Sequence, residues 1–141
     1  MKIQDIMTSQ VEVLAPESSI LEAAQLMDSS DIGSVPVCDG EKILGLVTDR
    51  DITTKVVAKG LDVNQVQLRD IMTSPIIYAF EDQTVEEASE IMQASQIRRL
   101  VVLNRDKKLV GVVALGDIAT KSDPITSGEA LEEISEGTKV A

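Results

Sequence analysis

The chain repeats itself, and this repetition limits its possible folds more than any other feature of the sequence. The pentapeptide Asp-Ile-Met-Thr-Ser stands at residues 5–9 and again, 65 positions later, at residues 70–74. The register continues along the chain and, after one inserted residue, brings residues 51–55 opposite residues 117–121. Repetition that holds over about 50 residues with a single gap indicates two copies of one structural unit.

Each copy is too small to fold well alone. The whole chain has 141 residues, and a domain of roughly 60 residues buries only about 60% of the surface that its unfolded chain exposes. We therefore expect the two copies to pack together. The sequence has one Tyr, one Phe and no Trp, so the core has to be aliphatic.

Each copy contains the signals of an amphipathic helix. Ser19 and Thr84 each stand three positions before a glutamate and ahead of apolar residues at helical spacing. A hydroxyl followed by a carboxylate at this distance is the pattern of a capping box, which satisfies free amides at the start of a helix. Met27 and Met92 lie on the two apolar stripes, so we expect both in the core.

Strand signals surround these helices. The predicted strands are residues 11–14, 35–38 and 43–47 in the first copy and 76–79, 100–103 and 109–113 in the second. Asp-Gly and Asn-Arg-Asp separate the last two strands of each copy, as is typical of hairpins. A final helix begins near Asp49 in one copy and near Gly116 in the other. The order β-α-β-β-α, twice, predicts a mixed α/β (α+β) fold.

The domain boundaries follow from the repeat. We predict a first repeat at residues 1–60, a linker at 61–67, a second repeat at 68–121 and an acidic tail at 122–141. The tail has Ala130, Leu131 and Ile134 at helical spacing. It is therefore expected either to dock as a short helix or to stay loose.

Charge and apolar content argue against two classes of partner. The sequence has 24 acidic and 13 basic residues and a formal net charge of −11. Such a chain is repelled by nucleic acid and by anionic lipid. No apolar stretch approaches the ~20 residues of a membrane span, and the N-terminus lacks the apolar core of a signal peptide. We expect no nucleic-acid partner and no membrane association.

Cys38 is the one cysteine and lies in an apolar run. A lone cysteine forms no internal disulfide, which fits a reducing compartment. We therefore expect a cytoplasmic protein in which Cys38 is a small core residue.

Enzyme signals are missing from the sequence. The chain has no histidine, which excludes Ser-His and Cys-His nucleophile pairs and zinc sites that use imidazole. It also has neither a Walker loop nor a Gly-x-Gly-x-x-Gly motif. Asp49 and Asp51 alone do not indicate a metal, because no further ligands converge on them in sequence. The sequence therefore predicts no catalytic residues, no metal and no enzyme activity.

The chain resembles a tandem pair of CBS (cystathionine β-synthase) domains, or Bateman module, of the stand-alone bacterial type. The resemblance spans residues 1–121. It is carried by the two Asp-Ile-Met-Thr-Ser openings and by residues 33–37, 45–52, 97–102 and 111–118. It implies two β-α-β-β-α units related by a pseudo-twofold axis, with their sheets packed together and two clefts between them. In this family those clefts take AMP, ADP or ATP, or in some cases S-adenosylmethionine or NAD.

The resemblance also implies a role. Such pairs are regulatory modules that sense an adenosine nucleotide and act on a partner protein. The alternative is a structural or protein-interaction module with no physiological ligand. Tandem pairs of this family commonly form homodimers through helical faces, and Ile52, Val56, Val57 and Ile118 are the candidates for such a face.

Thr48 and Asp51 match the positions that hold the ligand in the family. An ionised carboxylate only accepts hydrogen bonds, and the two hydroxyls of a ribose can both donate to it, so the residue matching Asp51 holds the ribose. A hydroxyl at Thr48, with free amides at a helix N-terminus, suits a phosphate. Arg98 and Arg99 match positions that grip phosphate oxygens. The residues implied to contact the ligand are Gly33, Ser34, Leu46, Thr48, Arg50, Asp51, Thr73, Ile76, Gln96, Ile97, Arg98, Arg99 and Asp117.

A second interpretation exists for the same residues. Thr48 and Asp51 also have the spacing of a capping box, and one residue can serve both purposes. Arg98 and Arg99 can be exposed charges of a strand. In the second repeat Ala114 replaces Thr48 while Asp117 keeps the carboxylate. The two clefts are therefore expected to be unequal, with the principal site at Asp51.

Overall fold

A computed structural model of the chain describes residues 1–121, and the predicted tail lies outside the described residues. The elements are η1 (Ile3–Asp5), α1 (Ile20–Ser30), β1 (Ser34–Asp39), β2 (Lys42–Thr48), α2 (Asp49–Ile52), η2 (Thr53–Val57), α3 (Leu68–Ile71), β3 (Tyr78–Phe80), α4 (Val85–Ser95), β4 (Arg99–Leu103), β5 (Leu109–Ala114) and α5 (Leu115–Lys121). η1 is a 3₁₀ turn and η2 a π-helical turn.

The chain divides into two compact units. One consists of Val11–Ile76, and we call it the Asp51 unit. The other joins Met1–Gln10 to the described residues from Ile77 to Lys121, and we call it the Asp117 unit. The units differ from the sequence repeats in one respect: each contains the opening segment of one repeat and the body of the other.

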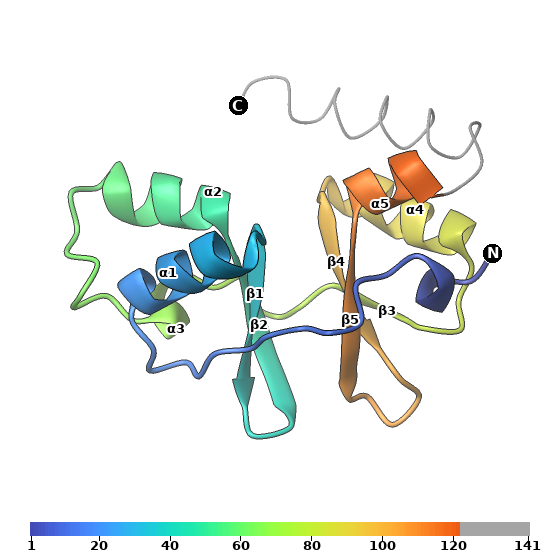
Figure 1. Cartoon of the computed structure of the whole chain (residues 1–141), viewed down its shortest axis with the longest axis horizontal. Helices are drawn as coiled ribbons and strands as arrows, with labels where there is room; N and C mark the ends of the chain where they lie inside the picture. The colour runs from blue at the N-terminus through green and yellow to red at the C-terminus, as the bar shows by residue number, and fades with distance from the viewer. Residues whose placement is uncertain (122–141) are drawn as a thin grey trace. The chain divides into compact units, whose positions relative to one another are not determined.

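Backbone hydrogen bonds produce this exchange. In the Asp117 unit Thr8 and Val112 exchange two bonds, of 2.9 and 3.0 Å. In the Asp51 unit Thr73 and Leu46 exchange two bonds, of 2.9 and 3.3 Å. Figure 1 shows the blue N-terminal segment beside the elements of the Asp117 unit. The Asp-Ile-Met-Thr segment of each repeat is therefore held by the second strand of the other repeat's hairpin.

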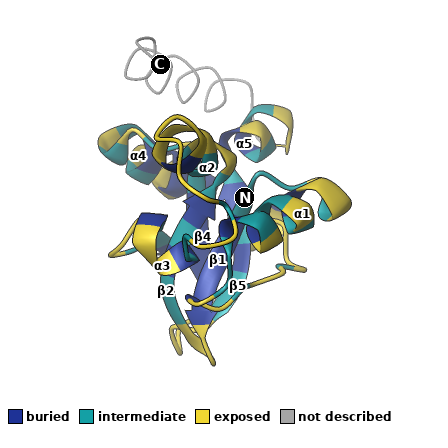
Figure 2. Cartoon of the chain, turned by 90° about the vertical axis from the view of Figure 1, so that its left-hand side faces the viewer, coloured by how far each residue is buried: buried dark blue, intermediate teal, exposed yellow. Residues whose placement is uncertain are grey.

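The Asp51 unit is built on the antiparallel hairpin of β1 and β2. Burial alternates along β2, where Gly45 and Val47 are buried between half-buried neighbours. Figure 2 shows β1 mostly in the colour of buried residues, while the helices carry both buried and exposed colours. The aliphatic core consists of Ile20, Ala23, Met27, Val35, Val37, Val47, Val56, Leu68 and Ile71.

The Asp117 unit has a three-stranded sheet in the order β3-β4-β5. β3 runs parallel to β4, and β4 pairs antiparallel with β5. Its core again is aliphatic and consists of Ile3, Ile6, Ala79, Val85, Ala88, Met92, Leu100, Val102, Val113, Leu115 and Ile118. The predicted order β-α-β-β-α is confirmed for the second repeat.

The first strand predicted in each repeat meets a different outcome in the two units. The strand predicted at residues 76–79 is present as β3, which begins two residues later, at Tyr78. Of the strand predicted at residues 11–14 only Leu14 pairs, through one parallel bridge to Val37. In the Asp117 unit the ladder continues because the amide of Glu81 donates to Leu103 O at 2.9 Å. The matching residue in the Asp51 unit is Pro16, which has no amide proton to donate. Pro16 therefore ends the ladder after Leu14, and Pro36 of β1, which stands where the other unit has Val101, has no amide proton to extend it before Leu14.

The predicted capping box is complete at Thr84, whereas at Ser19 only the bond to the serine hydroxyl is present. Ser19 Oγ accepts from the amide of Glu22 at 3.1 Å, and Thr84 Oγ1 accepts from the amide of Glu87 at 3.1 Å. The reciprocal bond from Thr84 N to Glu87 Oε1 is 3.5 Å. Met27 and Met92 are buried, as their place on the apolar stripes predicted.

The segment predicted as a linker packs against the Asp51 unit. Val63 and Val66 contact the core of that unit. Their carbonyls accept from the first amides of α1, from Leu21 at 3.0 Å and from Ile20 at 3.2 Å. These bonds satisfy donors at the helix start that have no partner inside the helix. Within residues 1–121, none of the helices is long and apolar enough to cross a membrane.

Candidate functional site

The opening motif of the second repeat positions one side of the candidate site. Asp70 Oδ2 accepts from the amide of Gln67 at 3.0 Å, which caps the short helix α3. Ile71 is buried in the core of the Asp51 unit. Met72 and Thr73 then pass over Gly45 of β2. These contacts hold the motif against the Asp51 unit, and they therefore position Thr73 and the chain that leads to Ile76.

The motif of the first repeat does the same in the Asp117 unit. Asp5 Oδ2 accepts from the amide of Lys2 at 2.9 Å, and Ile6 is buried. Met7 and Thr8 pass over Gly111 of β5. Two copies of one pentapeptide thus make two copies of one crossing.

These crossings require glycine in the strand below. A Cβ atom added at Gly45 would lie 2.8 Å from both Met72 Sδ and Thr73 O. One added at Gly111 would lie 2.6 Å from Met7 Sδ and 2.8 Å from Thr8 O. Carbon atoms do not approach backbone oxygens this closely, so any side chain would displace the crossing segment. The glycines are there because two backbones meet.

Thr48 and Asp51 form the predicted capping box. Asp51 N donates to Thr48 Oγ1 at 3.1 Å, and Thr48 N donates to Asp51 Oδ2 at 2.9 Å. The structure therefore confirms the capping interpretation of this pair. Accepting a bond uses a lone pair of Thr48 and leaves its hydroxyl proton available to a ligand oxygen, so capping and ligand binding are compatible.

The other oxygen of Asp51 is held by a lysine. Lys55 Nζ lies 3.1 Å from Asp51 Oδ1 and donates to the carbonyl of Ile71 at 3.0 Å. The side chain of Asp51 is 14% exposed and that of Lys55 is 46% exposed. The carboxylate is thus fixed at both oxygens and linked, through the lysine, to the end of α3.

The Asp117 unit repeats this arrangement with one part missing. Ala114 N donates to Asp117 Oδ2 at 2.8 Å, and Lys121 Nζ lies 3.4 Å from both Asp117 Oδ1 and the carbonyl of Ile6. Ala114 has no hydroxyl to accept from the amide of Asp117. The carboxylate is present in both units, while the hydroxyl that completes the capping box of the Asp51 unit is absent from the Asp117 unit.

The structure divides the predicted site residues between the two units. The Asp51 unit holds Gly33, Ser34, Leu46, Thr48, Arg50, Asp51, Thr73 and Ile76, and the Asp117 unit holds Gln96, Ile97, Arg98, Arg99 and Asp117. Ser34 pairs with Thr48 across the first hairpin, and Arg99 pairs with Ala114 across the second. Leu46 and Thr73 meet through their backbones. The ligand contacts implied for Gln96, Ile97 and Arg98 stay predictions.

Gln96 has a local role that the sequence interpretation did not include. It ends α4 in the left-handed region, with φ of 53°, and its side-chain amide donates to Gln93 O at 2.8 Å. Asp31 ends α1 in the same way, with φ of 52°. Both residues set the direction of the chain as it enters β1 and β4.

Lys55 and Lys121 are the residues that sequence reasoning missed. A signal was present, because Thr-Lys follows three residues after each aspartate, at 54–55 and at 120–121. On a helix this spacing puts the lysine one turn from the carboxylate. Their bonds to Ile71 and Ile6 had no sequence signal, because they depend on which opening segment lies beside which helix.

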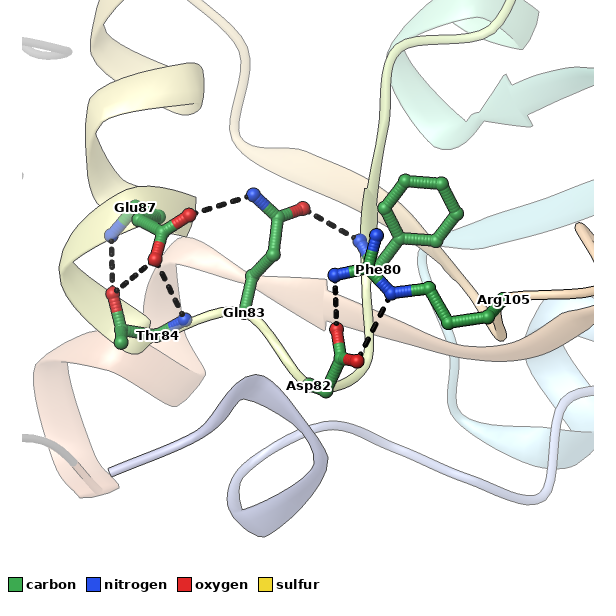
Figure 3. Close-up of polar contacts among 6 residues, drawn as sticks. All are labelled: Phe80, Asp82, Gln83, Thr84, Glu87 and Arg105. Atoms are coloured by element: carbon green, nitrogen blue, oxygen red, sulfur yellow. Dashed lines mark hydrogen bonds and ion pairs between the residues drawn. The ribbon is translucent and has the colours of Figure 1, made fainter.

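A second polar network lies in the Asp117 unit, between β3 and α4 (Figure 3). Arg105 donates to Asp82 through two bonds, of 2.8 and 3.0 Å, and its guanidinium lies 4.2 Å from the centre of the Phe80 ring. Gln83 accepts from the amide of Phe80 and donates to Glu87, both at 2.8 Å. The hydrogen bond from Arg105 holds the pKa of Asp82 below its usual value. The network joins a loop to a helix start.

Metal ligands do not gather in the part of the chain that the structure describes: residues 1–121 contain no group of three or more His, Cys, Asp or Glu side chains placed to hold an ion. Cys38 is buried, and burial raises the pKa of its thiol. This agrees with its predicted place in the core.

Comparison with known proteins shows the family. The model of the CBS domain matches residues 3–58 and again residues 68–123. The CBS domain-containing protein YhcV of Bacillus subtilis is 37% identical over 134 residues, which cover 94% of each chain.

Solved structures show the same fold. The crystal structure of Hypoxic Response Protein I with two coordinated zinc ions has a TM-score of 0.77 and 33% identity, over 87% of this chain and all of that one. The CBS domain protein PAE2072 of Pyrobaculum aerophilum, complexed with AMP, has a TM-score of 0.81 and 24% identity, over 94% and 99% of the two chains. The chain described here belongs to the CBS domain family and is a tandem pair of CBS domains.

Proposed function

We propose that this protein is a cytoplasmic regulatory module that binds an adenosine nucleotide, with its principal site at Asp51, and acts on a partner protein. The observation that carries the proposal is the Asp51 carboxylate, which is half-buried and held at both oxygens. It lies in the same unit as Thr48, Thr73 and Ile76. A ligand would meet a carboxylate that is already oriented.

The chemistry of the group suits a nucleotide. A carboxylate has about four lone-pair positions, and the protein occupies one on each oxygen of Asp51. One position on each oxygen remains for the two hydroxyls of a ribose. The hydroxyl proton of Thr48 is available to a phosphate oxygen. Charge-assisted bonds of this kind are short and strong.

Two further facts support an adenosine ligand. The site residues match the positions that hold AMP, ADP or ATP in the family, and PAE2072, which shares the fold, was crystallised with AMP. Arg98 and Arg99 would supply positive charge for the phosphates. AMP, ADP and ATP are the first choices, and S-adenosylmethionine and NAD are the next.

The Asp117 site would bind more weakly. Ala114 cannot offer the bond that Thr48 offers to a phosphate. A lost hydrogen bond to a charged group costs about 1.5–3 kcal/mol, which corresponds to roughly tenfold or more in affinity. We expect one strong site per chain and a second that is weak or empty.

Isothermal calorimetry and thermal shift with AMP, ADP, ATP, S-adenosylmethionine and NAD test the proposal. A ligand at 100 times its dissociation constant stabilises the fold by about 2.7 kcal/mol. Asp51→Ala should abolish tight binding, and Asp117→Ala, the matched control, should leave most of it. If none of the nucleotides binds at millimolar concentration, the sensing function is wrong and an interaction module without a ligand becomes the better description. If Asp117→Ala alone removes binding, the principal site is misassigned.

We also propose that the chain forms a homodimer. Val56 and Ile118, two of the four residues predicted for a helical interface, are fully buried in their own cores. Val57, the last residue of η2, is 62% exposed, and Leu61, which follows the turn after that helix, is 48% exposed. Covering this apolar pair is a reason to dimerise. Light scattering should give twice 15.2 kDa, and Val57→Lys should lower it; a monomer at high concentration would contradict the proposal.

A further inference from the structure

One ammonium group connects the candidate carboxylate to a different segment of the chain. Lys55 Nζ contacts Asp51 Oδ1 at 3.1 Å and the carbonyl of Ile71 at 3.0 Å. Asp51 lies in the first turn of α2, while Ile71 is the last residue of α3. The lysine therefore links α2 to the end of α3 and bonds to a carbonyl 16 residues further along the chain than itself.

The contact to Ile71 satisfies a group that the helix itself leaves open. The last carbonyls of a helix have no partner within it, and a lysine near the C-terminal end can bond to them. Within α3 the Leu68 carbonyl accepts from Met72 N, and the chain then becomes extended. Lys55 thus caps a helix end and pairs with a carboxylate at the same time.

The same arrangement recurs at Lys121 in the Asp117 unit. Its Nζ lies 3.4 Å from both Asp117 Oδ1 and the carbonyl of Ile6. Ile6 follows the 3₁₀ turn η1, just as Ile71 ends α3. An isolated i,i+4 ion pair on a surface contributes little, but two copies of a three-way contact at matching positions indicate a built feature.

We propose that Lys55 is the positioning residue of the Asp51 site, a role that rests on the proposed nucleotide function. Lys55 sets the plane of the carboxylate and ties it to the segment that carries Thr73 and Ile76. With Oδ2 held by Thr48 N and Oδ1 held by Lys55, the remaining lone pairs have fixed directions. A pair of ribose hydroxyls is recognised by those directions. Lys121 has the same role at Asp117, with longer contacts.

The test is discrimination between riboses. Dissociation constants are measured for AMP, 2′-deoxy-AMP and 3′-deoxy-AMP with the wild type and with Lys55→Met, which keeps the apolar stem and removes the charge. The wild type should prefer AMP by about tenfold, the value of one charge-assisted bond. In Lys55→Met the preference should fall below about threefold, because the carboxylate loses its orientation, and Lys55→Arg should restore part of it.

Two matched variants serve as controls. Lys121→Met removes the equivalent lysine of the other unit, and Lys59→Met removes an exposed lysine in the turn after η2, four residues beyond Lys55. Both should keep the wild-type preference for AMP. A merely structural role for Lys55 would weaken the binding of all three nucleotides equally, and that result would overturn the proposal.

Amide hydrogen exchange tests the positioning role of Lys55 without a ligand. Lys55→Met should speed exchange several-fold at Thr48 and Thr73, whose amides bond to Asp51 and Leu46. Lys121→Met should instead speed amide exchange at Ala114 and Thr8. If the wild type binds AMP while neither the exchange nor the ribose preference responds to Lys55→Met, only the role of Lys55 is refuted. If the wild type binds no nucleotide, the proposed function and the ligand role of Lys55 are both refuted, whatever the exchange shows.

Discussion

The Asp51 unit and the Asp117 unit are built from one sequence pattern, but their stabilising contacts lie at different positions. The Asp51 unit has a complete capping box at Thr48 and a close lysine contact, and only a single bridge where a third strand would lie. The Asp117 unit has the third strand and the Arg105–Asp82 network, but lacks the hydroxyl at Ala114. The two units share one frame, but the Asp51 unit has a hydroxyl beside its carboxylate and the Asp117 unit has the more extensive sheet.

The largest loss of stability is expected at the glycines under the two backbone crossings, a feature that the two units share. Gly45→Ala and Gly111→Ala each place a Cβ within 2.8 Å of a backbone oxygen, and overpacking of this kind costs about 1–3 kcal/mol. Chemical denaturation should show similar losses for both variants.

Gly116→Ala is the control, because a Cβ there meets nothing within 4 Å. It should leave the free energy of unfolding unchanged or raise it, since alanine favours a helix more than glycine does. If only one of Gly45 and Gly111 were sensitive, the crossings in the two units would not be equivalent.

Exchanging the capping residues should reverse a difference between the units. Thr48→Ala removes the acceptor of the Asp51 amide, and losing a cap of this kind costs about 1 kcal/mol. Ala114→Thr supplies the missing hydroxyl to the amide of Asp117 and should stabilise the fold by a smaller amount. Thermal unfolding of both variants and of the double variant measures this, and a destabilised Ala114→Thr would contradict the equivalence of the two caps.

A smaller effect should come from the network of Figure 3, and it should depend on pH. The pKa of Asp82 is lowered in the folded chain, first by its hydrogen bond to Arg105. A lowered pKa means that the pairing stabilises the fold above the unfolded value, near 3.8, and that this contribution is lost as the pH falls through the folded value. Arg105→Met should therefore lower the melting temperature at neutral pH and matter little at acid pH.

Arg69→Met is the matched control in the Asp51 unit, because Arg69 pairs with Glu17 through one bond of 2.9 Å. Its effect at neutral pH should be smaller than that of Arg105→Met. An equal effect would mean that the second bond and the Phe80 ring add nothing to the Arg105 pair.

The smallest change in stability is expected on substituting Cys38, which stands where the Asp117 unit has Leu103. Burial raises the pKa of the thiol, and the thiolate is the reactive form. A thiol reagent at neutral pH should label Cys38 slowly in the folded chain and rapidly in denaturant. Cys38→Leu should fold with little change in stability, because the other unit accommodates leucine there. Rapid labelling of the folded chain would show that the hairpin opens easily.

Much of the local structure could be predicted from the sequence. The caps at Ser19 and Thr84, the buried Met27 and Met92 and the two hairpins follow from signals that lie within a few residues of each other. The absence of a full strand before α1 also had causes in the sequence, Pro16 and Pro36, although the comparison with the paired strands of the other unit was needed to recognise them. Lys55 had a signal for its pairing with Asp51 but none for its bond to Ile71.

The sequence by itself determined that there are two copies of one unit and which side chains each copy carries. Only the tertiary structure decided which opening segment packs on which hairpin. The two openings are the same pentapeptide, and both hairpins offer a glycine, Gly45 or Gly111, for the crossing. Either pairing would satisfy the same local contacts, so sequence pattern cannot choose between them. The choice rests on long-range packing, and it places Thr73 and Ile76 in the same unit as Asp51.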